Sequence, residues 1–273
     1  MGRIIDVHIH CSEMDDDILN SYAKINGLEY NMKELIDLMK ENGIESGLLL
    51  SPALANGIPV PNERIIELCK RSNGRLFPVL TVEPSKTSVS ESLQMVEKNK
   101  GMIKGFKIRL GYRSVYPYDP VFYPLYEYAQ MTSLPVMYHT GDTAVPNASL
   151  LHAHPINIDR VANQWDELKM IICHFGNPWF MDTAEIVYKH QNVYADISGL
   201  FLRGAKYSSK YMGYLAEMIS NAIYHIGNVD KILFGTDYPV ETYSDAIAFV
   251  RMLDIDEEDR EKIFYYNAKK LFF

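Results

Sequence analysis

The chain alternates short apolar runs with longer segments of mixed polarity. Eight runs, rich in β-branched and other large apolar residues, predict strands near residues 4, 47, 76, 105, 135, 170, 193 and 232. Between them, segments such as 32–42 and 64–70 place apolar residues three and four positions apart, which is typical of amphipathic helices. Asn42-Gly43 and Asn73-Gly74 mark expected helix ends, because glycine tolerates the left-handed conformation that closes a helix.

Strands and helices that alternate eight times predict a parallel sheet closed into a barrel. The rival arrangement, an open doubly wound sheet, is expected to carry a glycine-rich phosphate turn after its first strand, whereas histidines follow residues 4–7 here. Neither an internal repeat nor a Pro/Ser-rich linker divides the sequence. We therefore predict an α/β fold of the (β/α)8 TIM-barrel class, with residues 1–273 as a single domain.

The first predicted strand carries polar residues on one of its faces. Side chains alternate along a strand, so Asp6, His8 and His10 point the same way and the apolar residues between them point the other way. Buried imidazoles need partners, and histidines two residues apart stand about 7 Å apart at their backbones, so they can converge on one ion. Taken alone, this His-x-His pattern is a weak signal, and two core histidines are its ordinary explanation.

Three further strands end in residues that bind metals or transfer protons. His139 closes the fifth strand, His174 the sixth and Asp237 the eighth. In a barrel all the carboxyl ends of the strands meet in one ring, so His8 and Asp237 are expected to be neighbours in space. The positions of these residues, more than any single motif, predict a metal site at this end of the barrel.

Composition and charge narrow the classes of function. Hydrophobic residues make up 47% and charged residues 23% of the chain, which is ordinary for a soluble globular protein. The formal net charge is −8 and Lys and Arg are scattered, whereas nucleic acids need a concentrated basic footprint. No run approaches the roughly 18 apolar residues of a membrane span, the amino terminus lacks a signal peptide's apolar core, and the three cysteines form no CxxC pair. We expect a cytoplasmic protein that binds neither nucleic acid nor membrane.

Several motifs together resemble those of a known family. They are IIDVHIHC at the start, LPVMYHTGD, the run HPINIDRVANQWDELKMIICHFGNPW, NVYADISG, ILFGTDYP and the closing IFYYNAKKLF. Their order and strand placement are similar to those of the amidohydrolase superfamily. They look most like its amidohydrolase-related branch, which contains hydrolases and the non-oxidative decarboxylases related to aminocarboxymuconate-semialdehyde decarboxylase. The resemblance runs from residue 4 to residue 272.

The resemblance implies one divalent metal ion per chain, usually zinc, with His8, His10, His139 and Asp237 as its ligands. Manganese or iron would suit such ligands too. The resemblance also implies that a water fills an open position on the metal, and that His174 orients or deprotonates this water or polarises the substrate. Asp237 and His174 are therefore the expected catalytic residues.

Lys107 and Arg109 share one face at the end of the fourth strand and are expected to bind substrate. Relatives with two metals carry at the Lys107 position a lysine that carbon dioxide has modified into a bridging carbamate. The alternatives are an unmodified Lys107 ammonium that meets a substrate carboxylate, and a structural ion pair, for instance with Asp6. Arg109 either pairs a carboxylate through two hydrogen bonds or lies solvated at the rim.

The remaining polar candidates have weaker claims. Asp142 and Asp196 are expected to lie in the interior near the site, with substrate contact as the alternative. His152 and His154 are expected to be hydrated loop residues, with substrate contact by one of them as the alternative, and His190 and His225 are expected to be structural residues of the outer helices.

Metal-assisted hydrolysis of a carbon–oxygen or carbon–nitrogen bond in a small carbonyl substrate is the leading hypothesis. In it the metal lowers the pKa of bound water, Asp237 accepts the proton and His174 stabilises the oxyanion. The first alternative is non-oxidative decarboxylation of a small unsaturated or aromatic acid at the same site. The second is a barrel that binds a ligand without turnover, although binding alone does not require an open metal position. The expected partner is a small-molecule substrate, and a homodimer stays open as the assembly.

Overall fold

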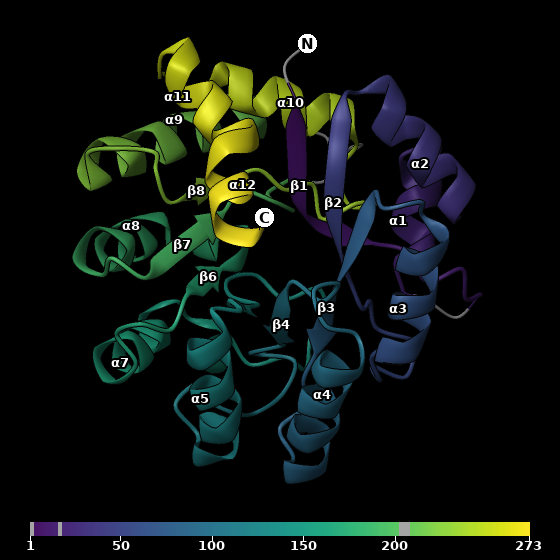
Figure 1. Cartoon of the computed structure of the whole chain (residues 1–273). Coiled ribbons are helices and arrows are strands. Elements are labelled where there is room, and N and C mark those ends of the chain that lie inside the picture. The colour runs from purple at the N-terminus through teal and green to yellow at the C-terminus, as the bar shows by residue number, and fades with distance from the viewer. Residues whose placement is uncertain (1–2, 16–17, 202–207) are drawn as a thin grey trace. The chain divides into compact units, whose positions relative to one another are not determined.

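The computed structural model describes residues 3–15, 18–201 and 208–273 (Figure 1). Each of the eight apolar runs forms a strand. The strands are β1 (Ile4–His10), β2 (Ile44–Leu50), β3 (Leu76–Thr81), β4 (Gly105–Ile108), β5 (Val136–Tyr138), β6 (Met170–Ile172), β7 (Val193–Asp196) and β8 (Ile232–Leu233). They form one sheet in sequence order from β1 to β8. The pair β1 and β2 is parallel, as are all the pairs from β3 to β7.

At least one helix separates each strand from the next. In chain order, the helices are α1 (Asn20–Ile25), α2 (Met32–Glu41), α3 (Asn62–Arg71), α4 (Lys86–Lys98), η1 (Pro120–Phe122), α5 (Tyr123–Thr132), α6 (Leu150–Ala153), α7 (Ile156–Gln164), η2 (Cys173–Gly176), α8 (Phe180–Lys189), α9 (Ser208–Ile226), α10 (Tyr243–Met252), α11 (Glu257–Glu261), η3 (Lys262–Tyr266) and α12 (Asn267–Phe272). The two helices predicted from residue spacing, 32–42 and 64–70, correspond to α2 and α3.

Backbone hydrogen bonds join the first strand to the segment that follows the last one. Val7 N donates to Phe234 O over 3.0 Å, and His10 N donates to Tyr238 O over 2.8 Å. A parallel sheet in sequence order, with a helix after every strand and its first and last strands paired, is the (β/α)8 arrangement. The predicted fold class is confirmed.

The chain divides into two compact units. The first comprises Met1–Pro78, Ile197–Asn221 and Ile232–Phe273, and the second comprises Val79–Asp196 and Ala222–Lys231. The first unit therefore holds β1, β2 and β8, and the second holds β4 to β7. The expectation that residues 1–273 form a single domain stays a prediction.

Helix α2 shows how the sequence builds the outer layer of the first unit. The Asn31 side chain accepts the Glu34 N–H over 2.8 Å and so caps the start of the helix. Met32, Leu35 and Met39 are spaced by three and four residues and are all buried, and the helix contacts β2. Truncating one such side chain to alanine would cost about 2–5 kcal/mol of stability.

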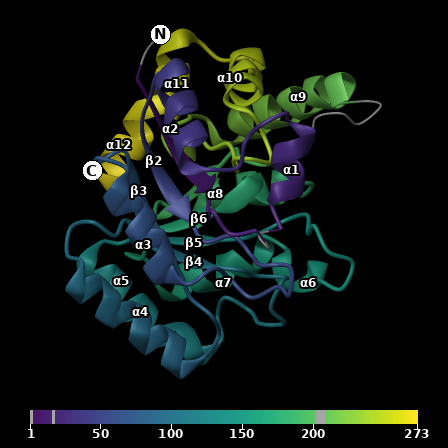
Figure 2. The same ribbon diagram turned by 90° about the vertical axis from the view of Figure 1, so that its right-hand side faces the viewer.

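In the second unit, α4 and α5 pack against each other, as a second direction of view also shows (Figure 2). Ser85 caps α4 by accepting the Ser88 N–H over 3.1 Å. Val89 and Val96 are the buried apolar residues of α4, and Leu125 is one of those of α5. Each helix thus has one buried and one solvated face, as the helices around a parallel barrel do.

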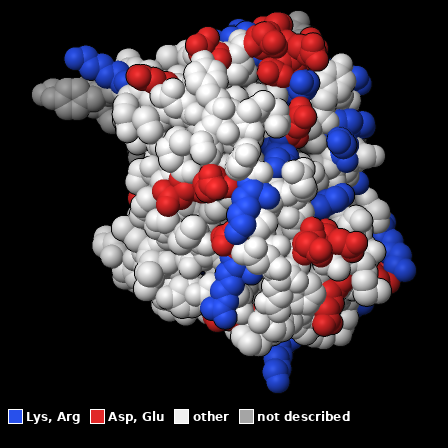
Figure 3. All heavy atoms as spheres, turned by 90° about the vertical axis from the view of Figure 1, so that its left-hand side faces the viewer, with Lys and Arg blue, Asp and Glu red and all other residues white. Residues whose placement is uncertain are grey.

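Charged side chains on the surface are mixed in sign. On the face shown in Figure 3, Lys and Arg lie among Asp and Glu. Within the described residues, every helix is too short or too polar to cross a bilayer.

Strand β1 is buried on both of its faces. Ile5, Val7 and Ile9 are at most 1% exposed, and the polar residues Asp6 and His8 are 0% and 1% exposed. Burying a polar group without a partner costs free energy, so the partners of Asp6 and His8 have to be found among their neighbours. Those partners define the site.

Candidate metal centre

Three polar side chains of the first unit converge at the carboxyl ends of β1 and β8. The Oδ1 atom of Asp237 lies 3.0 Å from His10 Nε2 and 3.5 Å from His8 Nε2. One ligand atom from each residue lies within 4.8 Å of the others. The sequence predicted these three as metal ligands, and the structure brings them together.

Hydrogen bonds on the far sides of the rings orient both imidazoles. His10 Nδ1 lies 2.9 Å from the Leu50 carbonyl oxygen, which can only accept, so Nδ1 carries the hydrogen. His8 Nδ1 lies 3.0 Å from Ser198 Oγ. When His8 Nδ1 donates there, both Nε2 atoms direct a lone pair toward Asp237. Outer hydrogen bonds of this kind are what fix the ring and tautomer of metal-bound histidines.

This donor set fits a divalent metal ion. It offers two imidazole nitrogens and one carboxylate oxygen, the ligands that zinc, manganese and iron accept. The side chains of His8, His10 and Asp237 are only 1%, 13% and 15% exposed. An ion held there would therefore be largely shielded from water, where its attraction to the carboxylate is strongest.

The two predicted catalytic residues share a backbone feature. Asp237 has φ +52° and His174 has φ +58°, in the left-handed region that residues other than glycine rarely adopt. Holding a residue there costs about 1–3 kcal/mol, and such residues cluster at functional sites. His174 lies two residues beyond the end of β6, and Asp237 lies four residues beyond the end of β8.

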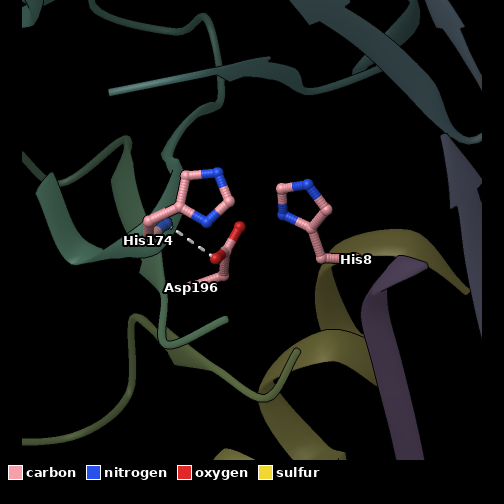
Figure 4. Close-up of side chains that lie close together, drawn as sticks. All are labelled: His8, His174 and Asp196. Carbon is pink, nitrogen blue, oxygen red and sulfur yellow. Dashed lines mark hydrogen bonds between the residues drawn. The ribbon is translucent and has the colours of Figure 1, made fainter. Parts of the chain in front are cut away.

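In the second unit, His139 and His174 are neighbours. His139 Nε2 lies 2.9 Å from the Asp142 carbonyl oxygen, so this nitrogen carries the hydrogen. His139 Nδ1 is then an acceptor, and His174 Nε2 lies 3.2 Å from it. The backbone N–H of His174 donates to Asp196 Oδ1 over 2.9 Å (Figure 4). Asp196 is fully buried, as expected for an interior residue, whereas Asp142 is exposed, so the expectation that it lies in the interior is wrong.

Lys107 and Arg109 have different surroundings in the second unit. Lys107 is 4% exposed and donates from Nζ to Cys173 Sγ over 2.8 Å. Burial raises the pKa of the Cys173 thiol well above its usual range. The Arg109 guanidinium lies 5.0 Å from the centre of the Tyr112 ring, which is 4.7 Å from the His139 ring. Burial lowers the pKa of Arg109, against the opposing effect of nearby Glu83.

The remaining histidines have other partners. His152 packs on Tyr116 and His154 on Trp179, with ring centres 4.5 Å and 4.4 Å apart. His190, which follows α8, and His225, in α9, each contact a carboxylate. His190 contacts Asp159 over 2.7 Å and His225 contacts Glu185 over 2.7 Å.

Some residues that shape the site were absent from the sequence-based set. Ser198 lies two residues after Asp196, where strand alternation puts it on the same face, and this spacing was a usable signal. Thr236 precedes Asp237, and its hydroxyl bonds to Asp6 over 2.6 Å. The Leu50 and Asp142 carbonyl oxygens belong to the backbone, so no residue-type pattern indicates their role.

Comparisons with known proteins identify the family of this chain. The family model described as Amidohydrolase matches residues 5–273. A gamma-resorcylate decarboxylase from Polaromonas sp. (strain JS666 / ATCC BAA-500) is 24% identical over 295 aligned residues, which cover 87% of this chain and 86% of that protein.

Solved structures share the fold over nearly the whole chain. An uncharacterized TIM-barrel protein from Bordetella bronchiseptica has a TM-score of 0.77 at 21% identity, covering 99% of this chain and 98% of that one. A probable 2-pyrone-4,6-dicarboxylic acid hydrolase from Acinetobacter baumannii, with citric acid bound, has a TM-score of 0.73 at 18% identity and covers 99% of both chains. A dihydroxybenzoic acid decarboxylase from Polaromonas sp. JS666, with bound manganese and the inhibitor 2-nitroresorcinol, has a TM-score of 0.70 at 17% identity, covering 99% and 97%.

At these identities the solved structures establish the fold, and the family model establishes the family. It extends from β1 to the last residue and so includes every residue of the candidate metal centre. By sequence and by fold, the chain belongs to the amidohydrolase family.

Proposed function

We propose that the chain is a metal-dependent, non-oxidative decarboxylase of a small aromatic or unsaturated carboxylic acid. The observation that carries this proposal is the convergence of His8, His10 and Asp237 on a point that fits a divalent ion. The names of the relatives support the choice of reaction, because two gamma-resorcylate decarboxylases match 87% of this chain each.

His139 is the proposed fourth ligand of a single metal ion. The resemblance of the sequence motifs to the amidohydrolase superfamily implies this role, and His139 follows directly on the end of β5. Because its Nε2 donates to the Asp142 carbonyl oxygen, His139 would bind through Nδ1. Zinc is the expected ion and manganese is its main competitor, since the similar dihydroxybenzoic acid decarboxylase contains manganese. A bound ion would supply a Lewis acid that holds and polarises oxygen atoms of the substrate.

The side chains of the protein would then have to transfer one proton to the substrate. In decarboxylation the bond between the substrate carbon and its carboxylate breaks, the electron pair stays on the carbon, and carbon dioxide leaves. The carbon takes up a proton, so one proton is consumed for each turnover. Asp237 is the proposed donor because its carboxyl lies beside both imidazoles, and His174, which lies beside His139, is the group proposed to pass or hold the proton.

Arg109 is the proposed partner of the substrate's anionic group. Arg109 is partly buried, and its guanidinium lies over the Tyr112 ring that contacts His139. A guanidinium can hold a carboxylate through two parallel hydrogen bonds. Lys107 donates to Cys173 and adds a second positive charge on the same strand. The expected substrate is a small molecule, and the cytoplasm stays the expected compartment.

Hydrolysis, the leading hypothesis from the sequence, is the second candidate. A specific observation favours it, because a probable 2-pyrone-4,6-dicarboxylic acid hydrolase shares the fold at a TM-score of 0.73. In this reaction Asp237 would take the proton from the attacking water, and His174 would stabilise the oxyanion. Both reactions would use the same residues, so only assays with candidate substrates can distinguish them.

A substrate screen with metal-loaded and chelated protein tests the proposal. Aromatic hydroxy acids would be assayed for carbon dioxide release, and esters, lactones and amides for acid release. We expect metal-dependent release of carbon dioxide and about one equivalent of metal by elemental analysis. Acid release without carbon dioxide would replace decarboxylation by hydrolysis. Saturable ligand binding without product would favour a binding barrel.

A further inference from the structure

A fully buried carboxylate joins β1 to the segment that carries Asp237. Asp6 is 0% exposed. Its Oδ1 atom accepts the His8 N–H over 3.0 Å and the Thr236 N–H over 3.2 Å, and its Oδ2 atom accepts the Thr236 hydroxyl over 2.6 Å. Asp6 therefore binds the strand of the two histidines and the residue that precedes Asp237.

The Thr236 hydroxyl extends this contact to the other side of Asp237. While it donates to Asp6, its oxygen accepts the Tyr238 N–H over 3.0 Å. The Tyr238 carbonyl oxygen accepts the His10 N–H over 2.8 Å, so Tyr238 is also bound to β1. The residues before and after Asp237 are thus both bound to each other and to β1.

Between these two fixed residues, Asp237 has φ +52°. This left-handed conformation costs an aspartate about 1–3 kcal/mol and persists only where its surroundings impose it. In this conformation, Oδ1 of Asp237 faces the Nε2 atoms of His8 and His10. The hydrogen bonds of Asp6 and Thr236 supply the constraint that opposes this cost.

Folding alone gives no reason for a carboxylate at position 6. The neighbouring side chains of Ile5 and Val7 are at most 1% exposed, and an apolar residue would fill the same strand without the cost of burying a charge. What Asp6 adds is a set of accepted hydrogen bonds that only an oxygen-rich side chain can provide. These hydrogen bonds come from His8, itself a predicted metal ligand, and from Thr236, which directly precedes Asp237.

We propose that Asp6 and Thr236 are positioning residues that hold Asp237 in its left-handed conformation and so aim its carboxylate at His8 and His10. The effect that we expect of this positioning on metal affinity rests on the proposed metal site. It concerns only the first unit, where all five residues lie.

Substitutions at Thr236 separate positioning from packing. Thr236→Val keeps the shape of the side chain but removes the hydroxyl, whereas Thr236→Ser keeps the hydroxyl and removes a methyl group. Ser220→Ala is the matched control in α9 of the same unit. The Ser220 hydroxyl is also buried, and it donates to Ala216 O over 2.7 Å and accepts the Asp254 N–H over 3.0 Å.

The experiment titrates cobalt(II) into chelated protein and records the visible spectrum, which reports the geometry of the ligands, together with the melting temperature. We expect Thr236→Val to weaken cobalt affinity by about 10-fold to 100-fold and to change the spectrum, the scale found for residues that orient metal ligands. Thr236→Ser should restore affinity to within about threefold of the wild type. Ser220→Ala should lower the melting temperature to a similar extent with unchanged affinity.

Crystal structures of the wild type and Thr236→Val complete the test. We expect Asp237 to leave the left-handed region, or its carboxylate to turn away from His8 and His10, in the variant. Unchanged affinity and an unchanged Asp237 conformation would overturn the positioning role. A wild type that fails to bind cobalt would overturn the proposed metal site instead, and the Asp237 conformation in the two crystal structures would still decide the inference. If Thr236→Val does not fold, Thr236→Ala removes the same hydroxyl with a smaller side chain.

Discussion

The two units present their histidines in opposite ways. In the first unit, His8 and His10 direct Nδ1 outward to Ser198 and to the Leu50 carbonyl oxygen, so Nε2 is the inward nitrogen beside Asp237. In the second unit, His139 directs Nε2 outward to a carbonyl oxygen, and its inward Nδ1 faces His174. The first arrangement turns two imidazole lone pairs toward one carboxylate, which suits an ion. In the second, His139 Nδ1 is an acceptor beside His174 Nε2, so without an ion it can take a hydrogen from His174, and with an ion bound to Nδ1 the His174 ring is left to handle a proton.

The units resemble each other in how they support a strained residue. Asp237 and His174 both have left-handed backbones, and a fully buried aspartate accepts a backbone N–H beside each of them. Asp6 accepts from Thr236, next to Asp237, and Asp196 accepts from His174 itself. Similar backbone support can therefore serve a predicted ligand in one unit and a predicted proton carrier in the other.

Removing a ligand from the first unit should have the largest effect. His10→Ala deletes one of the three converging donors, so we expect metal content to fall from about one equivalent to below about a tenth, and turnover to fall to background. The melting temperature of the metal-loaded protein should also fall, because an ion that binds only the folded chain stabilises it. Elemental analysis and thermal melts measure both.

His225→Ala is the control for this change. His225 lies in α9, is paired with Glu185 and is 40% exposed. Its loss should leave metal content unchanged. If His225→Ala loses as much metal as His10→Ala, the convergence of donors in the first unit is not the metal site.

His174→Ala tests the second half of the comparison. If His174 moves a proton and is not a ligand, the variant should keep most of its metal and lose about a hundredfold or more in turnover, the usual scale for a positioned acid or base. Metal content and turnover are measured on the same preparation. A metal-free variant would make His174 a ligand, and a metal-loaded variant with full activity would remove it from the mechanism.

Arg109→Met should have a smaller and more selective effect. Loss of a guanidinium that binds a carboxylate should raise KM for the acid substrate by about 10-fold to 100-fold, with a smaller change in kcat. The decarboxylated product lacks the carboxylate, so its inhibition constant should change by less than about threefold. Steady-state kinetics with product inhibition separates the two. Equal weakening of substrate and product would point to a general disturbance of the pocket instead of carboxylate recognition.

The sequence was informative wherever side-chain periodicity carried the signal. The eight apolar runs gave the strands, and alternation along β1 placed Asp6, His8 and His10 on one face. Asp237 and His10 are 227 positions apart in the sequence, yet the closure of the barrel predicted their contact, which is 3.0 Å.

What the sequence did not yield depends on the backbone. The Leu50 and Asp142 carbonyl oxygens orient His10 and His139, and every residue has such an oxygen. The left-handed conformations of Asp237 and His174 carry no residue-type signal either, since neither residue is glycine. Lys107 had several possible partners on chemical grounds, and its contact with the Cys173 thiol was not among them.

Replacing Glu241 should have the smallest effect. This residue holds backbone N–H groups of the first unit. Its side chain is 2% exposed, and Oε1 accepts the backbone N–H groups of Leu200 and Phe201, just beyond Ser198. Burial raises the pKa of Glu241 well above its ordinary value of 4.5, although these two hydrogen bonds oppose the shift. Because the folded pKa is raised, the fold favours the protonated form. The stabilisation is complete below the unfolded pKa and is lost as the pH rises through the folded pKa.

Glutamine at this position keeps an oxygen that accepts both N–H groups and stays neutral at every pH. We therefore expect Glu241→Gln to gain in melting temperature relative to the wild type as the pH rises above about 4.5, by a few degrees at most, since about 1 kcal/mol corresponds to about 2–4 °C in a chain of this size. Melts of both proteins across pH 4 to 8 measure the difference. Glu91→Gln, on the exposed side of α4, is the control and should show no such trend. A difference that stays constant with pH would mean that Glu241 does not titrate between the two states. A variant that loses stability as the pH rises would mean that the charged carboxylate is the form that anchors Leu200 and Phe201.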